Sequence, residues 1–166
     1  MSGKPVTLTV VCTANICRSP MAAGLLRHAL EGEPNPPPFR VRSAGLAARD
    51  GEPVSENSRI AMERVGIDIS DHRSRMLTPE LLSESSAVFG MTSDHIRMIE
   101  TLFPAANGHL RLFREFADSG SPEVPDPFGR SIDDYIQCRD SLLDAIPGLL
   151  RFLYQEVFPA SNGQSR

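Results

Sequence analysis

Apolar and polar residues alternate along the chain in two different patterns. Short apolar stretches rich in β-branched residues predict strands, and the first is nearly continuous, which is typical of a strand buried on both faces of a parallel sheet. The expected strands cover residues 6–11, 39–44, 86–91 and 109–113. Between them, apolar residues recur at the spacing of an amphipathic helix. The expected helices cover residues 20–30, 55–65, a short segment that starts at Pro79, 93–102 and 132–158.

Residues that start and stop helices mark the boundaries of these segments. Ser19 and Thr78 are expected to be N-caps, because each offers a side-chain oxygen and precedes a proline at the first helical position. Gly66 is expected to end the second helix, and Pro147 to kink the last one. The proline-rich residues 118–130 predict a loop.

Strands that alternate with helices predict an α/β fold. The expected architecture is a four-stranded parallel sheet with helices on both faces. No internal repeat and no second composition break is visible, so residues 1–166 are expected to form a single domain.

Composition narrows the class of protein. A hydrophobic content of 40% and a charged content of 23% are those of a globular domain. The net charge of -4 argues against a nucleic-acid-binding protein, and no apolar run approaches the roughly 18 residues of a membrane span. Three cysteines without an export signal predict a reducing, cytoplasmic location.

Residues 11–20 read VCTANICRSP and lie at the predicted turn between the first strand and the first helix. Ligands of open α/β sheets bind at the carboxyl ends of strands, where a helix N-terminus offers free backbone N–H groups and the positive end of its dipole. The residues between Cys12 and Arg18 can therefore wrap a tetrahedral anion, which Arg18 can hold through a bidentate fork. The same field favours the thiolate form of Cys12, which is the nucleophilic form.

Other interpretations of Cys12 and Arg18 are open at this point. A buried structural cysteine beside a surface arginine has the same spacing, and the preceding strand, the following Ser-Pro pair and the position at the sheet edge favour the nucleophile over it. Cys12 and Cys17, with only Cys138 elsewhere, do not supply a four-ligand zinc site, so neither a metal nor another cofactor is expected.

Four segments resemble the low-molecular-weight protein tyrosine phosphatase family. VCTANICRSPMA looks like its signature, and VPDPFGRSIDDY is similar to its general-acid loop. The SAG of residues 43–45 and the DHRSR of residues 71–75 also match. The resemblance covers most of the chain and implies the fold expected above.

The resemblance implies a protein phosphatase that forms a phosphocysteine intermediate. Cys12 would attack phosphorus, Arg18 would hold the equatorial oxygens, and Asp126 would protonate the leaving oxygen and later activate water. The phosphate-binding loop would consist of Thr13, Ala14, Asn15, Ile16, Cys17 and Arg18. The implied substrate is a phosphorylated protein or peptide, with phosphate or another oxyanion bound in the loop.

Further positions are assigned by the same resemblance. Asn15 and Ser19 would brace the loop and stabilise the thiolate, with Ser43 and His72 as hydrogen-bonding partners. For His72, a solvated loop histidine is the alternative. Cys17 would form a reversible disulfide with Cys12 on oxidation, whereas the remaining cysteine, within the last helix, is expected to pack.

The substrate class has two main candidates. Arginine-specific relatives carry a threonine after the loop asparagine, whereas this chain has Ile16, an apolar side chain that favours the aryl group of phosphotyrosine. Phe128 would leave one aromatic wall for that group. DPFG and IDDY look closer to the arginine-specific type.

Two further hypotheses about the function are disfavoured by particular residues. Arsenate reductases of this fold need further cysteines near the third strand, and residues 70–100 contain none. A non-catalytic phosphate-binding module would have no need of Cys12 together with Asp126.

Overall fold

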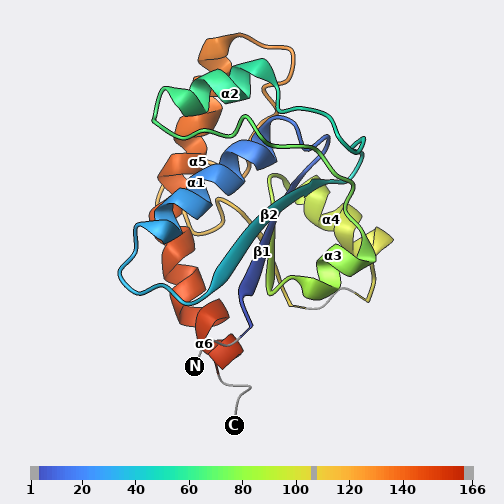
Figure 1. Cartoon of the computed structure of the whole chain (residues 1–166). Helices are drawn as coiled ribbons and strands as arrows, with labels where there is room; N and C mark the ends of the chain where they lie inside the picture. The colour runs from blue at the N-terminus through green and yellow to red at the C-terminus, as the bar shows by residue number, and fades with distance from the viewer. Residues whose placement is uncertain (1–3, 106–107, 163–166) are drawn as a thin grey trace.

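A four-stranded parallel sheet lies at the centre of the computed structural model, which describes residues 4–105 and 108–162 (Figure 1). The strands are β1 (Val6–Cys12), β2 (Phe39–Gly45), β3 (Ala87–Gly90) and β4 (His109–Leu112), in the order β2-β1-β3-β4. All seven residues of β1 are buried, as expected for a central strand. Single-domain α/β architecture with a four-stranded parallel sheet is confirmed.

Helices cover both faces of the sheet (Figure 1). They are α1 (Arg18–Glu31), α2 (Glu56–Glu63), α3 (Pro79–Glu84), α4 (Ser93–Leu102), α5 (Ile132–Phe152), the π-helix η1 (Leu153–Val157) and α6 (Phe158–Asn162). Helices α1 and α5 pack together on one face, and α3 and α4 lie on the other. None of the helices within the described ranges is both long and apolar enough to cross a bilayer.

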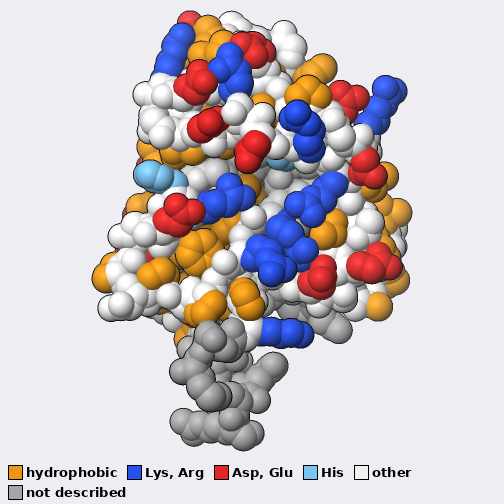
Figure 2. Space-filling view, in the orientation of Figure 1, with side chains coloured by type: hydrophobic (Ala, Val, Ile, Leu, Met, Phe, Trp, Pro, Cys, Tyr) orange, Lys and Arg blue, Asp and Glu red, His pale blue; other side chains and the backbone are white. Residues whose placement is uncertain are grey.

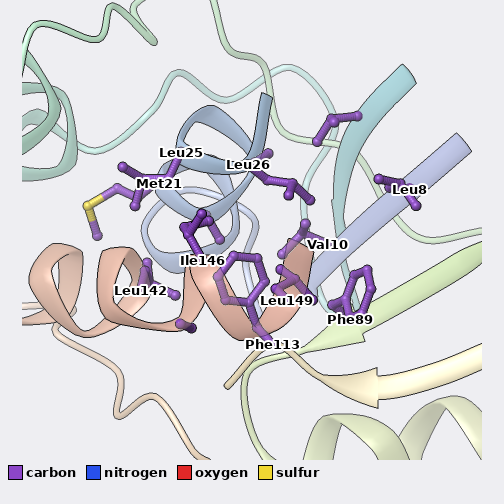
Figure 3. Close-up of a cluster of buried hydrophobic side chains, with 14 of the residues drawn as sticks. Leu8, Val10, Met21, Leu25, Leu26, Phe89, Phe113, Leu142, Ile146 and Leu149 are labelled. Carbon is purple, nitrogen blue, oxygen red and sulfur yellow. The ribbon is translucent and has the colours of Figure 1, made fainter. Parts of the chain in front are cut away.

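Alternating side chains of β1 divide the core between these two faces. Leu8 and Val10 join the larger cluster with α1 and α5, whereas Val11 joins the smaller cluster with Leu82 of α3 and Ile99 of α4. Figure 3 shows the larger cluster, in which side chains of α1 and α5 meet those of β1 and β3. Burying each large aliphatic side chain contributes about 1.5–3 kcal/mol to the stability of the fold. The packed core therefore holds the strands from which the loops at the sheet edge start.

The start of α1 differs from the prediction. The helix begins at Arg18 with Cys17 at the N-cap, and no side chain caps it. The prediction of Ser19 as N-cap is therefore wrong. The Ser19 hydroxyl instead lies 3.0 Å from the sulfur of Cys12 and accepts a hydrogen bond from Asn15, so tertiary partners compete with capping.

Other boundaries agree more closely. The expected bounds of α4 are confirmed, and Thr78 caps α3 through a bond from the Leu81 N–H. α2 is shorter than predicted and ends before Gly66, which has φ +78°. α5 continues through Pro147, and the departure from α-helical geometry comes later, at η1.

Figure 2, in the same orientation, shows basic and acidic side chains interspersed with apolar ones. Basic side chains gather near the centre of this view, over β2, with acidic side chains beside them. This face therefore carries no extended field of one sign, in line with the modest net charge of -4.

Candidate active site

The turn between β1 and α1 places the predicted loop at the carboxyl edge of the sheet. Asn15 has φ +60°, a left-handed conformation that asparagine tolerates better than most residues. The residues that directly follow β2 hold this turn through two hydrogen bonds. The N–H groups of Leu46 and Ala47 donate to the carbonyls of Cys12 and Thr13 at 3.0 and 2.9 Å.

Gly45 is needed at this contact. A Cβ atom there would lie 2.6 Å from the carbonyl oxygen of Thr13 and 2.8 Å from the Cβ of Ala48, both far inside van der Waals contact. The absence of a side chain lets β2 approach the loop closely, and the loop geometry depends on that approach.

The Cys12 sulfur lies at the base of the loop. The residue is only 2% exposed and belongs to the larger core cluster. Its Sγ nevertheless accepts a hydrogen bond from the Asn15 N–H at 3.3 Å and lies 3.0 Å from the Ser19 hydroxyl. Both contacts suit a negatively charged sulfur acceptor.

Neighbouring amides of the loop are available for an anion. Among the residues that the structure describes, the N–H groups of Ala14, Ile16 and Cys17 donate to no protein acceptor. Free N–H groups next to a helix N-terminus form an anion-binding concavity. Phosphate is a ligand that this concavity can hold.

Asn15 is hydrogen-bonded to three of the predicted loop supports and to one further residue, Arg75. Its amide donates to the Ser19 and Ser43 hydroxyls at 2.8 and 2.9 Å, and its Oδ1 accepts the Arg75 N–H at 2.9 Å. His72 donates from Nε2 to the Asn15 carbonyl at 2.7 Å, and burial lowers the pKa of this histidine. His72 is thus a bonded, half-buried residue in this network rather than a freely solvated one.

Arg18 lies at the mouth of the loop and is 4% exposed. Its Nη1 donates to the Val124 carbonyl at 3.0 Å, and its Nη2 lies 3.5 Å from the Thr13 hydroxyl. Its buried Nε has no hydrogen-bond partner among the described residues. A buried guanidinium donor without an acceptor is costly, so an oxyanion that accepts from Nε would relieve that cost.

Asp126 completes the group from the opposite loop. Its Oδ2 lies 3.6 Å from Arg18 Nη2, and its Oδ1 accepts the Phe128 N–H at 3.1 Å. The carboxylate is half-exposed, with a side-chain accessibility of 49%, so both solvent and a bound anion can reach it. The loop is fixed by the Val124 N–H, which donates to the Met91 carbonyl at 2.9 Å.

The three cysteines have different surroundings, and all three are unpaired. The Cys17 sulfur lies 3.4 Å from the Tyr135 hydroxyl, and burial raises the pKa of both groups. Burial also raises the pKa of Cys138 to about 12, and this residue packs in the larger core cluster. Cys138 therefore has a packing position in the core.

Sequence reasoning missed two residues that contact the loop. His95, at the start of α4, is bonded through Nε2 to the Thr13 hydroxyl at 3.0 Å, and Tyr135 of α5 contacts Cys17. A threonine-x-x-histidine spacing directly after a buried strand was the available signal for His95, because it marks a capped helix at the carboxyl edge of the sheet. Tyr135 is the last residue of the matched segment VPDPFGRSIDDY, but nothing in that segment indicated a contact with Cys17.

No group of three or more His, Cys, Asp and Glu side chains in the described parts of the chain is arranged to hold a metal ion. The chemistry of the site rests instead on a sulfur nucleophile, free amides, a guanidinium and a carboxylic acid. These groups are the requirements of phosphoryl transfer through a covalent intermediate.

Comparison with known proteins identifies the family. Residues 7–158 match the family described as "Low molecular weight phosphotyrosine protein phosphatase". A protein-arginine-phosphatase of Geobacillus stearothermophilus is 35% identical over 152 residues, which cover 92% of this chain and 99% of that protein. The low molecular weight protein-tyrosine-phosphatase Ptp of Acinetobacter johnsonii is 36% identical over 121 residues, which cover 73% and 79%.

A solved structure supports the same grouping. The YwlE arginine phosphatase from Geobacillus stearothermophilus superposes with a TM-score of 0.81 at 34% identity, covering 93% of this chain and 97% of that one. The family match spans most of the chain, and the solved structure shares its fold. The chain therefore belongs to the low-molecular-weight phosphotyrosine protein phosphatase family and is a phosphatase enzyme.

Proposed function

We propose that the protein hydrolyses phosphotyrosine in phosphorylated proteins or peptides through a phosphocysteine intermediate. The observation that carries this proposal is the convergence of three groups on one loop: the Cys12 sulfur, amides without protein partners, and Arg18 in an ion pair with Asp126 at 3.6 Å. The groups come from two segments about 110 residues apart in the chain. Each has one defined part in phosphoryl transfer.

In the first step, the Cys12 thiolate attacks phosphorus while the P–O bond to tyrosine breaks. The loop amides and Arg18 hold the equatorial oxygens, whose negative charge they neutralise. Asp126, as the carboxylic acid, gives its proton to the departing phenolic oxygen. The products are free tyrosine side chain and a phosphocysteine.

In the second step, the Asp126 carboxylate takes a proton from water as the water oxygen attacks phosphorus. The P–S bond breaks, and the electron pair returns to sulfur as thiolate. Asn15 and Ser19 stabilise that leaving thiolate, because the Asn15 N–H donates to Sγ and the Ser19 hydroxyl lies beside it. Inorganic phosphate is released, and Asp126 is again protonated.

Two side chains support an aryl substrate. Ile16 is half-buried and packs against the larger core cluster, so its position in the loop is apolar and fixed. Phe128 follows the acid loop and is 65% exposed, which leaves its ring available to stack on a phenyl group. Neither side chain offers a hydrogen bond to a guanidinium.

Phosphoarginine is the second candidate substrate. The protein-arginine-phosphatase of Geobacillus stearothermophilus matches 92% of this chain, whereas the protein-tyrosine-phosphatase Ptp of Acinetobacter johnsonii matches 73%. The two sequence identities, 35% and 36%, are nearly equal. The longer match favours arginine specificity, whereas Ile16 favours tyrosine. We give more weight to Ile16 because it lies in the loop that surrounds the reacting phosphoryl group.

Paired substrates test this choice. Phosphotyrosine and phosphoarginine versions of one peptide would be compared on the wild type and on Ile16→Thr, with Cys12→Ser as the inactive control. We expect the wild type to prefer phosphotyrosine and Ile16→Thr to shift toward phosphoarginine. Preference of the wild type for phosphoarginine would overturn the substrate proposal, and wild-type turnover no greater than that of Cys12→Ser would overturn the mechanism.

We also propose that oxidation switches the enzyme off reversibly. Peroxide oxidises the Cys12 thiolate to a sulfenic acid, and the Cys17 thiol then displaces water to form a disulfide. Support comes from the two unpaired sulfurs in one loop. We expect dithiothreitol to restore activity after peroxide treatment of the wild type but not of Cys17→Ala; equal recovery in both would contradict this role for Cys17.

The proposed site of action is a reducing, cytoplasmic compartment. Cys12, Cys17 and Cys138 are all free thiols, and the mechanism requires Cys12 to stay reduced. Location of the tagged protein in cell fractions is the direct measurement, and recovery outside the cytoplasm would contradict this assignment.

A further inference from the structure

His95 is a buried histidine that belongs neither to the loop nor to the acid segment. It lies in the first turn of α4 and is 4% exposed. Its Nδ1 accepts the backbone N–H groups of Met91 and Thr92, both at 3.2 Å. The Thr92 hydroxyl accepts the N–H of His95 in return, so the two residues form a reciprocal cap.

The cap fixes which ring nitrogen carries the proton. Because Nδ1 accepts two N–H groups, the neutral ring carries its hydrogen on Nε2. That nitrogen lies 3.0 Å from the Thr13 hydroxyl, to which it therefore donates. Burial, followed by the positive charge of Arg18, lowers the pKa of His95 to about 4, against the opposing effect of Asp126, Asp94 and Glu123. The ring is thus neutral at neutral pH.

The Thr13 hydroxyl also contacts Arg18, so it connects His95 with the guanidinium. Its Oγ1 lies 3.5 Å from Arg18 Nη2, at the long end of a hydrogen bond, and the same Nη2 lies 3.6 Å from Asp126. The other side of the α4 N-terminus holds the acid loop, since the Ser93 N–H donates to the Glu123 carboxylate at 2.5 Å. One helix start therefore touches both catalytic segments.

We propose that His95 is a positioning residue that holds the Thr13 hydroxyl, and through it the Arg18 guanidinium, in place for the equatorial oxygens of the phosphoryl group. This inference rests on the proposed phosphatase function and extends it to a residue 82 positions from Thr13. A purely structural role as a helix cap would stabilise α4 without affecting Arg18. The two roles differ in which variants change turnover.

Separate variants remove the two halves of the contact. His95→Asn retains a short side-chain acceptor for the cap but cannot reach Thr13, and Thr13→Val removes the hydroxyl while leaving the cap untouched. Thr13→Ser is the conservative comparison for Thr13→Val, because it shortens the side chain but keeps the hydroxyl. Hydrolysis of an aryl phosphate, binding of inorganic phosphate by calorimetry and the melting temperature would be measured for each variant and for the double variant.

We expect kcat to fall about fivefold to tenfold in His95→Asn and in Thr13→Val, with a smaller change in KM and weaker phosphate binding. Thr13→Ser, which keeps the hydroxyl, should lose less kcat than Thr13→Val. The double variant should be no slower than the slower single variant, because both changes break one chain of contacts.

Three results would overturn the inference. One is a double variant whose loss is the product of the two single losses. Another is unchanged kcat and phosphate binding in His95→Asn with only a lower melting temperature, as expected of a simple cap. No turnover in the wild type would overturn the proposed function and this inference together, whereas either of the first two results with an active wild type overturns this inference alone.

Discussion

The turn after β1 and the turn after β3 lie side by side at the carboxyl edge of the sheet, and they start their helices in opposite ways. Val11 pairs with Gly90 in the parallel ladder, so the two turns leave the sheet at the same level. The first spans the five residues 13–17 and ends at an N-cap without a side-chain bond. The second spans only Met91 and Thr92 and ends in a capping box.

The two turns differ in what their amides bind. After β3, side chains accept the N–H groups of Met91, Thr92, Ser93 and His95, so the protein itself satisfies the helix start. After β1, the N–H groups of Ala14, Ile16 and Cys17 have no acceptor among the described residues. The start of α4, whose N–H groups are bonded by side chains, can support a neighbouring loop. The start of α1, whose preceding N–H groups are free, can bind an anion.

The contrast also explains the burial of polar groups around the first turn. An uncapped loop is unstable unless other contacts hold its shape, and here Asn15, Ser43 and the capped start of α4 provide them. The second turn thus stabilises the first through His95 and Thr13. Predictions that alter one turn and leave the other intact test this division of roles.

Removal of the nucleophile has the largest expected effect on the first turn. Cys12→Ser keeps the shape of the side chain but removes the thiolate, so kcat for an aryl phosphate should fall by about 10⁴-fold or more, as for other catalytic nucleophiles. The melting temperature should change little. Cys138→Ala, at the packing cysteine, is the control and should keep near wild-type kcat per folded molecule. Measurable residual activity above about one part in a hundred in Cys12→Ser would contradict the role of this sulfur.

The acid above the first turn has the next largest effect. Asp126→Asn removes the proton donor, and kcat for phenyl phosphate should fall by about 10²- to 10³-fold. The loss should be smaller with nitrophenyl phosphate, because its leaving group departs without a proton. Asp118→Asn, in the same exposed loop, is the matched control. Equal losses on the two substrates would exclude general-acid catalysis by Asp126.

Acid should weaken the second turn through His95. Its pKa is about 4 in the folded protein against 6.5 for a free histidine, so folding favours the neutral ring. The stabilisation is therefore complete above pH 6.5 and is lost as the pH falls toward 4, because the unfolded chain then binds the additional proton. The free energy of unfolding should fall by about 2–3 kcal/mol from this group between pH 7.5 and 4.5.

Urea unfolding of the wild type and of His95→Asn at both pH values measures this effect. Other groups, including His72 and the carboxylates, titrate in both proteins, so the difference between the two pH dependences reports on His95. A smaller pH dependence in His95→Asn is expected. Parallel curves would show that His95 is not held neutral by the fold.

The order of elements could be predicted from the sequence because each element depends on local periodicity. The bounds of α4 and the burial of β1 follow from apolar spacing, and the cluster around Cys12 follows from the resemblance to a known signature. The start of α1 could not be predicted, because the Ser19 hydroxyl has both a capping position and tertiary partners available. Local pattern does not decide between them.

Contacts between segments distant in the chain could not be predicted from the sequence either. Thr13 and His95 are 82 residues apart, and Cys17 and Tyr135 are 118 apart. The first pair meets because β3 lies next to β1 in the sheet order β2-β1-β3-β4, and the second because α5 packs on α1. The spacing before His95 and the matched segment that contains Tyr135 indicated helix starts near the sheet edge, but neither indicated which loop residue each side chain contacts.

Adding a single methyl group at Gly45, which contacts the first turn, has the smallest expected effect and changes only that turn. In Gly45→Ala, the new Cβ would lie 2.6 Å from the Thr13 carbonyl and 2.8 Å from Ala48, so the loop must move away from β2. We expect unfolding to become easier by about 1–3 kcal/mol and kcat to fall with it, because Arg18 and the amides lose their alignment. Gly32→Ala is the matched control: its φ is -83° and the nearest atom would be 3.6 Å away. If Gly45→Ala retained wild-type kcat and stability, the close approach of β2 would not determine the shape of the anion loop, and the second turn alone would have to hold it.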